Sequence, residues 1–125
     1  MLFPMSEPRK ILSLQPSTKT PEEREAEALA LLTLAIGRKQ CVRWTYNEVD
    51  MEAAPQAVYL KKESLYCDAV VTHRNGVKSK ELKLGSFRLS GLKGIKLSEN
   101  GSELWPDIQL SDGRYGVIIA AWGQT

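Results

Sequence analysis

The spacing of hydrophobic and polar positions changes once along the chain, near residue 37. Before that point, in "PEEREAEALALLTLAI" (21–36), apolar side chains recur every three to four residues. They form one stripe, made up chiefly of Leu29, Leu32 and Ile36. The pattern predicts an amphipathic helix over about 21–36 that buries this stripe.

The residues at the two ends of this segment are typical of helix termini. Thr20 is a good N-cap, Pro21 is preorganised for the first helical position, and Glu23 stands where a capping box closes. Gly37 follows the last apolar position and is the expected stop. The sequence therefore predicts both the type and the start of this element.

After the helix the apolar positions alternate with polar ones, which is the period of half-buried strands. Asn75-Gly76 predicts a type I′ hairpin turn, because these residues accept two positive φ angles. Gly85 is a candidate bulge position. The expected strands are 41–46, 56–60, 64–72, 77–89, 92–97 and 114–122.

One capped helix followed by five or six short strands predicts a mainly β fold with one helix, in the α+β class. A single helix is too small to cover both faces of an open sheet of that size. A small bent barrel with the helix plugging one end leaves fewer unpaired edges. The chain has 125 residues, so we expect one domain, 20–125, preceded by an N-terminal arm, 1–19.

The positive charge of the chain is concentrated in one segment. The net charge is +2, but residues 59–96 hold nine Lys and Arg against three Asp and Glu, which makes that segment +6 and the remainder −4. A local block of one sign indicates an anionic partner. The alternative is that these side chains are ordinary solvated strand faces.

The residues capable of catalysis or metal binding are few and scattered. Cys41 and Cys67 are isolated in apolar runs and are expected to be buried, reduced thiols. His73 is the single histidine, beside the predicted turn, with no nucleophile tied to it by spacing. We therefore expect no metal, no cofactor and no enzymatic activity. The absence of a long apolar run or a signal peptide predicts a cytoplasmic protein that does not enter a membrane.

Three stretches resemble the WYL domain, namely "LAIGRKQCVRWTYN", "AAPQAVYLKKESLYCDAVV" and "LGSFRLSGLKGIKL". The resemblance covers about residues 28–97. It places Tyr46 and Pro55 on the family's first tyrosine and its proline, 64–66 on or beside the Trp-Tyr-Leu motif, and 87–89 on the Phe-Arg-Leu motif. It implies a small Sm-like or SH3-like bent barrel of five to six strands after a helix.

The chain departs from the family pattern at two arginines that help to form the family's ligand groove. "MEAAP" lacks the arginine that usually precedes the proline, and Gly91 stands where the last motif has its arginine. The family's DNA-binding winged helix is also missing from this sequence. The resemblance therefore implies a standalone, divergent member.

These observations predict a non-enzymatic, ligand-binding regulatory module. A barrel face that carries basic residues and tyrosines can neutralise phosphates and stack bases, so the expected ligand is an anion such as single-stranded nucleic acid or a nucleotide. The candidate ligand-binding residues are Arg43, Tyr46, Tyr66, Lys83 and Arg88. Two alternatives stay open. In one, the tyrosines belong to the core. In the other, the barrel binds proteins, including a second copy of itself in a homodimer, and no nucleic acid.

Overall fold

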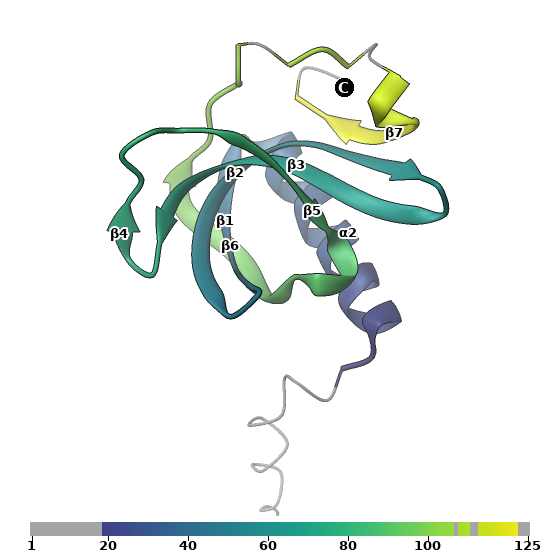
Figure 1. Cartoon of the computed structure of the whole chain (residues 1–125), viewed down its shortest axis with the longest axis horizontal. Helices are drawn as coiled ribbons and strands as arrows, with labels where there is room; N and C mark the ends of the chain where they lie inside the picture. The colour runs from purple at the N-terminus through teal and green to yellow at the C-terminus, as the bar shows by residue number, and fades with distance from the viewer. Residues whose placement is uncertain (1–18, 107, 111–112, 123–125) are drawn as a thin grey trace, which may run out of the picture.

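A computed structural model describes residues 19–106, 108–110 and 113–122 of the chain. The expected N-terminal arm lies outside these residues except for Lys19, which is exposed. The described chain consists of one long helix and a curled antiparallel sheet that together form a half-barrel (Figure 1). The predicted class, mainly β with one helix, is confirmed.

Helix α2 (Pro21–Arg38) begins as the sequence predicts. The Thr20 side chain accepts a hydrogen bond from the backbone N–H of Glu23, and the Glu23 carboxylate accepts one from the Thr20 N–H. The predicted end at Gly37 is wrong, because Gly37 is helical and the left-handed residue is Lys39 (φ 56°). The N–H of Lys39 bonds carbonyls of the last turn, so the helix closes without a glycine.

The sheet is built from seven strands and a 3-10 turn. Five strands make one path in the order β4-β3-β2-β1-β6, while β5 pairs with β3 and β7 pairs with β2. The strands are β1 (Gln40–Tyr46), β2 (Val49–Lys61), β3 (Ser64–Arg74), β4 (Val77–Lys78), β5 (Leu84–Arg88), β6 (Lys93–Gly101) and β7 (Val117–Ala121); η3 (Leu89–Gly91) precedes β6, and η4 (Gly113–Tyr115) precedes β7.

Strand β2 is longer than predicted and organises the sheet. Its first half pairs with β1 and its second half with β7, while β3 lies along its whole other side. Pro55, expected to lead a short strand, lies inside β2 at a register shift between Pro55 and Ala57. A bulge tolerates the missing N–H of proline, which explains why the strand continues through it.

The predicted single strand 77–89 is two strands. The Asn75-Gly76 turn is confirmed, with φ of 48° and 81°, but pairing after it stops at Lys78 and resumes at Leu84. The expected bulge at Gly85 is wrong, because β5 pairs with β3 without a register shift. Gly85 instead leaves room for the ring of Phe87, which would lie 3.2 Å from a Cβ at that position.

The core lies between α2 and the inner face of the curled sheet. Leu32 and Ile36 are buried there as predicted, Leu29 packs at the edge, and Leu34 is exposed. The helix also holds η3, because Arg24 Nε donates a hydrogen bond to the Ser90 carbonyl at 2.7 Å. This contact fixes the start of β6 relative to the end of β5.

The face of the sheet that points away from α2 is called the outer face below. Its central part is a small apolar cluster of Cys41, Ala54 and Val70, with Leu84 and Trp105 packed against it. Cys41 and Cys67 are both buried free thiols, Cys41 in this cluster and Cys67 in the main core. Polar side chains gather on both sides of the cluster, and they supply the candidate sites.

Candidate anion-binding site

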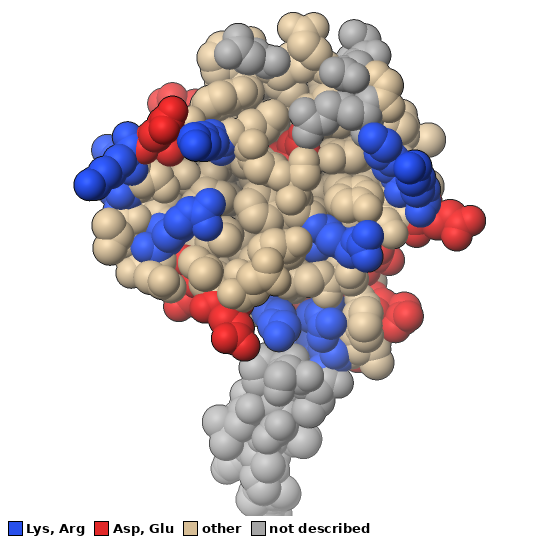
Figure 2. All heavy atoms as spheres, viewed as in Figure 1, with Lys and Arg blue, Asp and Glu red and all other residues tan. Residues whose placement is uncertain are grey.

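The five candidate residues do not form one site. Tyr66, Arg88 and Tyr46 lie near one another at the end of β3, whereas Arg43 and Lys83 lie in separate hollows of the surface. Figure 2 agrees with this division, since the Lys and Arg side chains on the visible face form separate groups around an uncharged centre. The five candidate residues are therefore divided among separate parts of the described surface, and whether any of them binds a ligand stays a prediction.

Tyr66 and Arg88 are direct cross-strand neighbours on β3 and β5. Arg88 Nη2 donates a hydrogen bond to the Tyr66 hydroxyl at 3.1 Å, and the guanidinium carbon lies 5.6 Å from the centre of the tyrosine ring. Paired residues of an antiparallel ladder point to the same face. The register of β3 and β5 thus produces an exposed arginine held against an aromatic ring.

The positive charge of Arg88 is not neutralised within the described chain. Its side chain is exposed, forms no ion pair with a described carboxylate, and spends one of five N–H donors on Tyr66. The hydrogen bond from Arg88 lowers the pKa of Tyr66 and raises that of Arg88. The pair therefore presents a fixed cation with unused donors, which is what a phosphate or carboxylate ligand requires.

A shallow groove of about 310 Å³ adjoins this pair. It is lined by Tyr59, Lys61, Lys62, Tyr66 and Ser86. Tyr59 stacks on Tyr66 with ring centres 5.7 Å apart and an interplanar angle of 22°. Two lysines and a pair of stacked rings thus extend the site, although Glu63 follows the lysines in the turn.

Sequence reasoning missed Tyr59, Lys61 and Lys62 as site residues. The signal was the short spacing of "YLKKESLY", which places two tyrosines on either side of a tight turn. In the structure Tyr59 and Tyr66 are register partners of β2 and β3. The turn residues Lys62 and Glu63 have φ of 50° and 68°. Positive φ angles are typical of glycine and asparagine, so this turn has no signal in the sequence.

A buried carboxylate lies beneath the groove. Asp68 is fully buried, and its Oδ1 accepts hydrogen bonds from the Tyr59 hydroxyl at 2.9 Å and the Ser86 hydroxyl at 2.6 Å. These bonds hold the ring of Tyr59, which also makes an edge-on contact with Tyr115, with ring centres 4.9 Å apart. The aromatic floor of the groove is consequently rigid, as a preorganised binding surface should be.

Tyr46 belongs mainly to the core rim. Its ring packs edge-on against Phe87, with centres 5.0 Å apart, and is half-buried. Gly91 lies beside it, where a Cβ would come within 3.0 Å of the Tyr46 ring. The alternative reading as a core aromatic therefore fits Tyr46 better than Tyr66.

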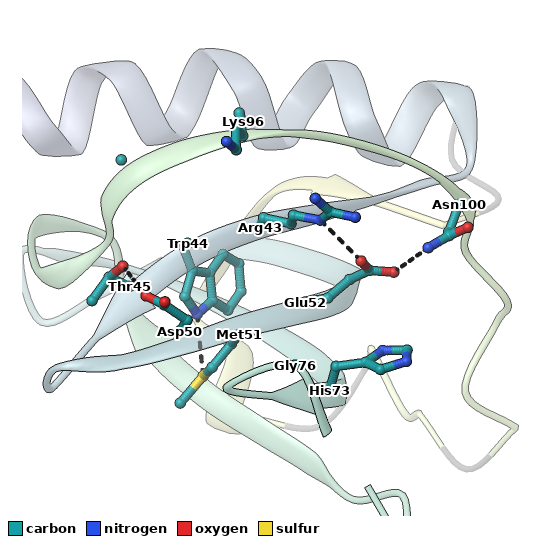
Figure 3. A pocket seen from close by; sticks show the side chains of 11 residues that line it. Arg43, Trp44, Thr45, Asp50, Met51, Glu52, His73, Gly76, Lys96 and Asn100 are labelled. Atoms are coloured by element: carbon teal, nitrogen blue, oxygen red, sulfur yellow. Dashed lines mark hydrogen bonds and ion pairs between the residues drawn. The ribbon is translucent and has the colours of Figure 1, made fainter. Parts of the chain in front are cut away.

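Lys83 and Arg43 have other surroundings. Lys83 Nζ lies 3.9 Å from the Glu81 carboxylate, and both side chains are more than three-quarters exposed, so the pair contributes little. Arg43 Nε bonds the Glu52 carboxylate at 3.1 Å in a pocket of about 550 Å³ on the far part of the outer face (Figure 3). Tyr66 and His73, which lines that pocket, are seven residues apart on β3, or about 23 Å.

Glu52 is the buried centre of this second pocket. Its side chain is 9% exposed, and its oxygens accept hydrogen bonds from Arg43 and from Asn100 Nδ2, the latter at 2.7 Å. Burial opposes the charged form, but the bonds from Asn100 and Arg43 outweigh it and lower the pKa of Glu52. The carboxylate is therefore ionised and already occupied by protein donors.

No protein-family model matches the chain, and no curated protein matches its sequence. Among solved structures it is similar to the proteasome accessory factor B/C (PafBC) of Arthrobacter aurescens, with a TM-score of 0.54 and 17% identity. The match covers 69% of this chain and 13% of PafBC. PafBC contains a WYL domain, so the likeness agrees with a WYL-type fold, and at this identity it concerns the fold alone.

Two other properties of the described residues concern metals and membranes. No group of three or more His, Cys, Asp or Glu side chains among them could hold a metal ion. No helix in the described part of the chain is long and apolar enough to cross a membrane.

Proposed function

We propose that the protein is a non-enzymatic regulatory module that binds an anionic ligand at Tyr66 and Arg88, and that this ligand is single-stranded nucleic acid or a nucleotide. One observation carries the proposal: an exposed guanidinium without a described carboxylate partner is held against a tyrosine ring. The likeness of the fold to PafBC, a regulatory protein with a WYL domain, supports the regulatory role.

The chemistry of the Tyr66–Arg88 site suits nucleotides better than simple anions. Arginine can bond a phosphate in a bidentate manner, with its two parallel N–H groups. Aromatic side chains and the guanidinium of arginine can both contact a base, whatever the identity of that base. Lys61 and Lys62 line the groove beside these groups, where they would contact neighbouring phosphates.

Binding of a fluorescently labelled oligothymidylate at low salt, followed by anisotropy, tests this function. Arg88→Ala should weaken the affinity about ten-fold or more, since a charge-assisted contact is lost. Tyr66→Ala should weaken it by a similar factor, because the ring and the hydroxyl that hold Arg88 in place are removed. Raising the salt concentration should weaken binding by the wild type, because counterions compete for the phosphate contacts.

Arg38→Ala is the matched control. It removes the same charge from an exposed residue at the far end of α2. Arg24, near the start of α2, contacts Ser90 close to the site, and Arg38 lies about 21 Å farther along the helix. Equal losses for Arg38→Ala and Arg88→Ala would mean that only net charge matters and that the site is elsewhere. No binding of oligonucleotides or nucleotides by the wild type at low salt would reject the proposal and favour a protein-interaction barrel.

A further inference from the structure

A row of ionisable residues crosses the outer face as direct cross-strand partners. Lys78 pairs with His73, His73 with Glu52, Glu52 with Arg43, and Arg43 with Lys96, so the row runs through β4, β3, β2, β1 and β6. A register shift between Glu52 and Ala53 is what brings His73 opposite Glu52. We call these five residues the charged row.

The charged row has more positive than negative members. Glu52 is its one carboxylate, and Arg43 Nε and Asn100 Nδ2 already bond it. Arg43 and Lys96 stand directly opposite each other although like charges in that position repel. No described carboxylate lies within ion-pair distance of Lys96. Two cations therefore lie side by side at this end of the row, with Glu52 as their one carboxylate neighbour within it.

The donors that remain free are close to one pocket. Within the described chain the two terminal nitrogens of Arg43 make no hydrogen bond, and His73 engages only Nδ1, at 2.9 Å from the Thr72 hydroxyl. All three residues, Arg43, His73 and Lys96, line the pocket of about 550 Å³, which is in the range of small-molecule sites. The pocket thus combines spare donors with room for a ligand.

The two carboxylates that line the pocket do not occupy the terminal nitrogens of Arg43 or the ammonium group of Lys96. Asp50 also lines the pocket, but its carboxylate accepts a hydrogen bond from the Thr45 hydroxyl at 2.7 Å. Figure 3 places Asp50 and Thr45 at the opposite end of the pocket from Asn100 and His73. Glu52 orients Arg43 by bonding Nε, which leaves the terminal nitrogens to a ligand. The groups of the pocket that lack a described partner are therefore hydrogen-bond donors.

We propose that the charged row is a second binding site, which takes the carboxylate or phosphate group of a small organic anion between Arg43 and Lys96. It is separate from the Tyr66–Arg88 site and does not depend on it. In this arrangement Arg43 donates from its terminal nitrogens, Lys96 supplies the second charge, and Glu52 is a positioning residue.

The test is a titration of the full chain with inorganic phosphate and, separately, with succinate, at constant ionic strength, followed by amide ¹H–¹⁵N spectra. The expected result is saturable shifts at Arg43, Lys96 and His73 with at least one of the two anions; the anion that saturates identifies the preferred group. Lys96→Ala should weaken that binding about ten-fold, the effect of a lost charge-assisted contact. The spectra themselves show that the variant is folded.

Lys80→Ala is the control, because it removes the same charge from an exposed loop residue outside the charged row; it should leave the affinity unchanged. Arg88→Ala should also leave it unchanged, which separates this site from the nucleotide site. Shifts that stay linear with both anions, or that Lys96→Ala does not alter, would overturn the proposal. So would loss of the shifts in Arg88→Ala.

Discussion

Arg88 and Arg43 lie on the same outer face, each on a strand of the same sheet, yet they have opposite surroundings. Arg88 bonds a phenol and has no described carboxylate partner, whereas Arg43 bonds the buried carboxylate of Glu52. In sequence both are basic residues in a strand next to aromatic residues. The chemistry of an arginine in a sheet therefore depends on its partner in the neighbouring strand.

The two regions also differ in how they are made rigid. The Tyr66–Arg88 site rests on stacked rings above the buried Asp68, and the charged row rests on the hydrogen bonds of Glu52. Both regions thus contain a buried carboxylate, but Asp68 accepts hydrogen bonds from two neutral hydroxyl groups, whereas Glu52 accepts them from a charged guanidinium and an amide. The following experiments separate these contributions, starting with the scaffold that both regions share.

The largest effect is expected when the shared scaffold is weakened. Leu32 is fully buried between α2 and the sheet, so Leu32→Ala should lower the free energy of unfolding by about 2–5 kcal/mol. Chemical denaturation measures this value. Leu34→Ala is the control, because Leu34 is 41% exposed on the same helix. A loss below about 0.5 kcal/mol for Leu32→Ala would contradict the packing of the helix.

Removing the charge of Glu52 should affect the charged row alone. Glu52→Gln should lower the free energy of unfolding by about 1–3 kcal/mol at neutral pH, because the hydrogen bonds of a buried carboxylate with Arg43 and Asn100 are weakened or lost. The matched control is Glu99→Gln, which alters an exposed residue of β6. Equal losses for the two variants would show that the bonds of Glu52 contribute nothing.

The same variant should change how stability depends on pH. The pKa of Glu52 is lowered in the folded state from 4.5, so its contribution is present above that value and is lost as pH falls through the folded pKa. The wild type should therefore lose stability below about pH 4.5, and Glu52→Gln should lose less over that interval. Denaturation midpoints measured at several acidic pH values check the sign.

A smaller effect should report the contact at the other region. The hydrogen bond from Arg88 lowers the pKa of Tyr66, so Arg88→Ala should raise that pKa toward its ordinary value. The ring carbon signals of Tyr66 in an NMR pH titration measure it. Arg38→Ala should leave the pKa where it is in the wild type. A Tyr66 pKa unaltered by Arg88→Ala would mean that the two side chains do not interact in solution.

The smallest effect concerns the two thiols, which lie on opposite faces of the sheet. Burial raises the pKa of Cys41 to about 11, and that of Cys67, in the main core, is raised further. Both should react slowly with a thiol reagent in the folded protein. Cys41 should react faster than Cys67, because a larger fraction of Cys41 is in the reactive thiolate form. Rapid labelling of both, or a disulfide in the intact mass, would contradict their burial as free thiols.

Local patterns were sufficient for the type and start of the helix and for the presence of most strands, but not for all of their ends. The capping box at Thr20 and Glu23 and the stripe through Leu32 act within a few residues, so they are visible in sequence. The Asn75-Gly76 turn is predicted for the same reason, since asparagine and glycine readily accept the required φ angles and no distant contact is needed to recognise them. The curled sheet then follows from having one helix and many short strands.

The identity of neighbours across strands was decided by the tertiary structure. Tyr66 and Arg88 were chosen from sequence, but their contact depends on the register of β3 and β5, and the charged row depends on a bulge at Glu52. A shift of one residue turns every side chain of a strand to the other face. Register is set by the packing of the whole sheet on α2, so no local stretch of sequence could assign Arg43 to Glu52 and Arg88 to Tyr66.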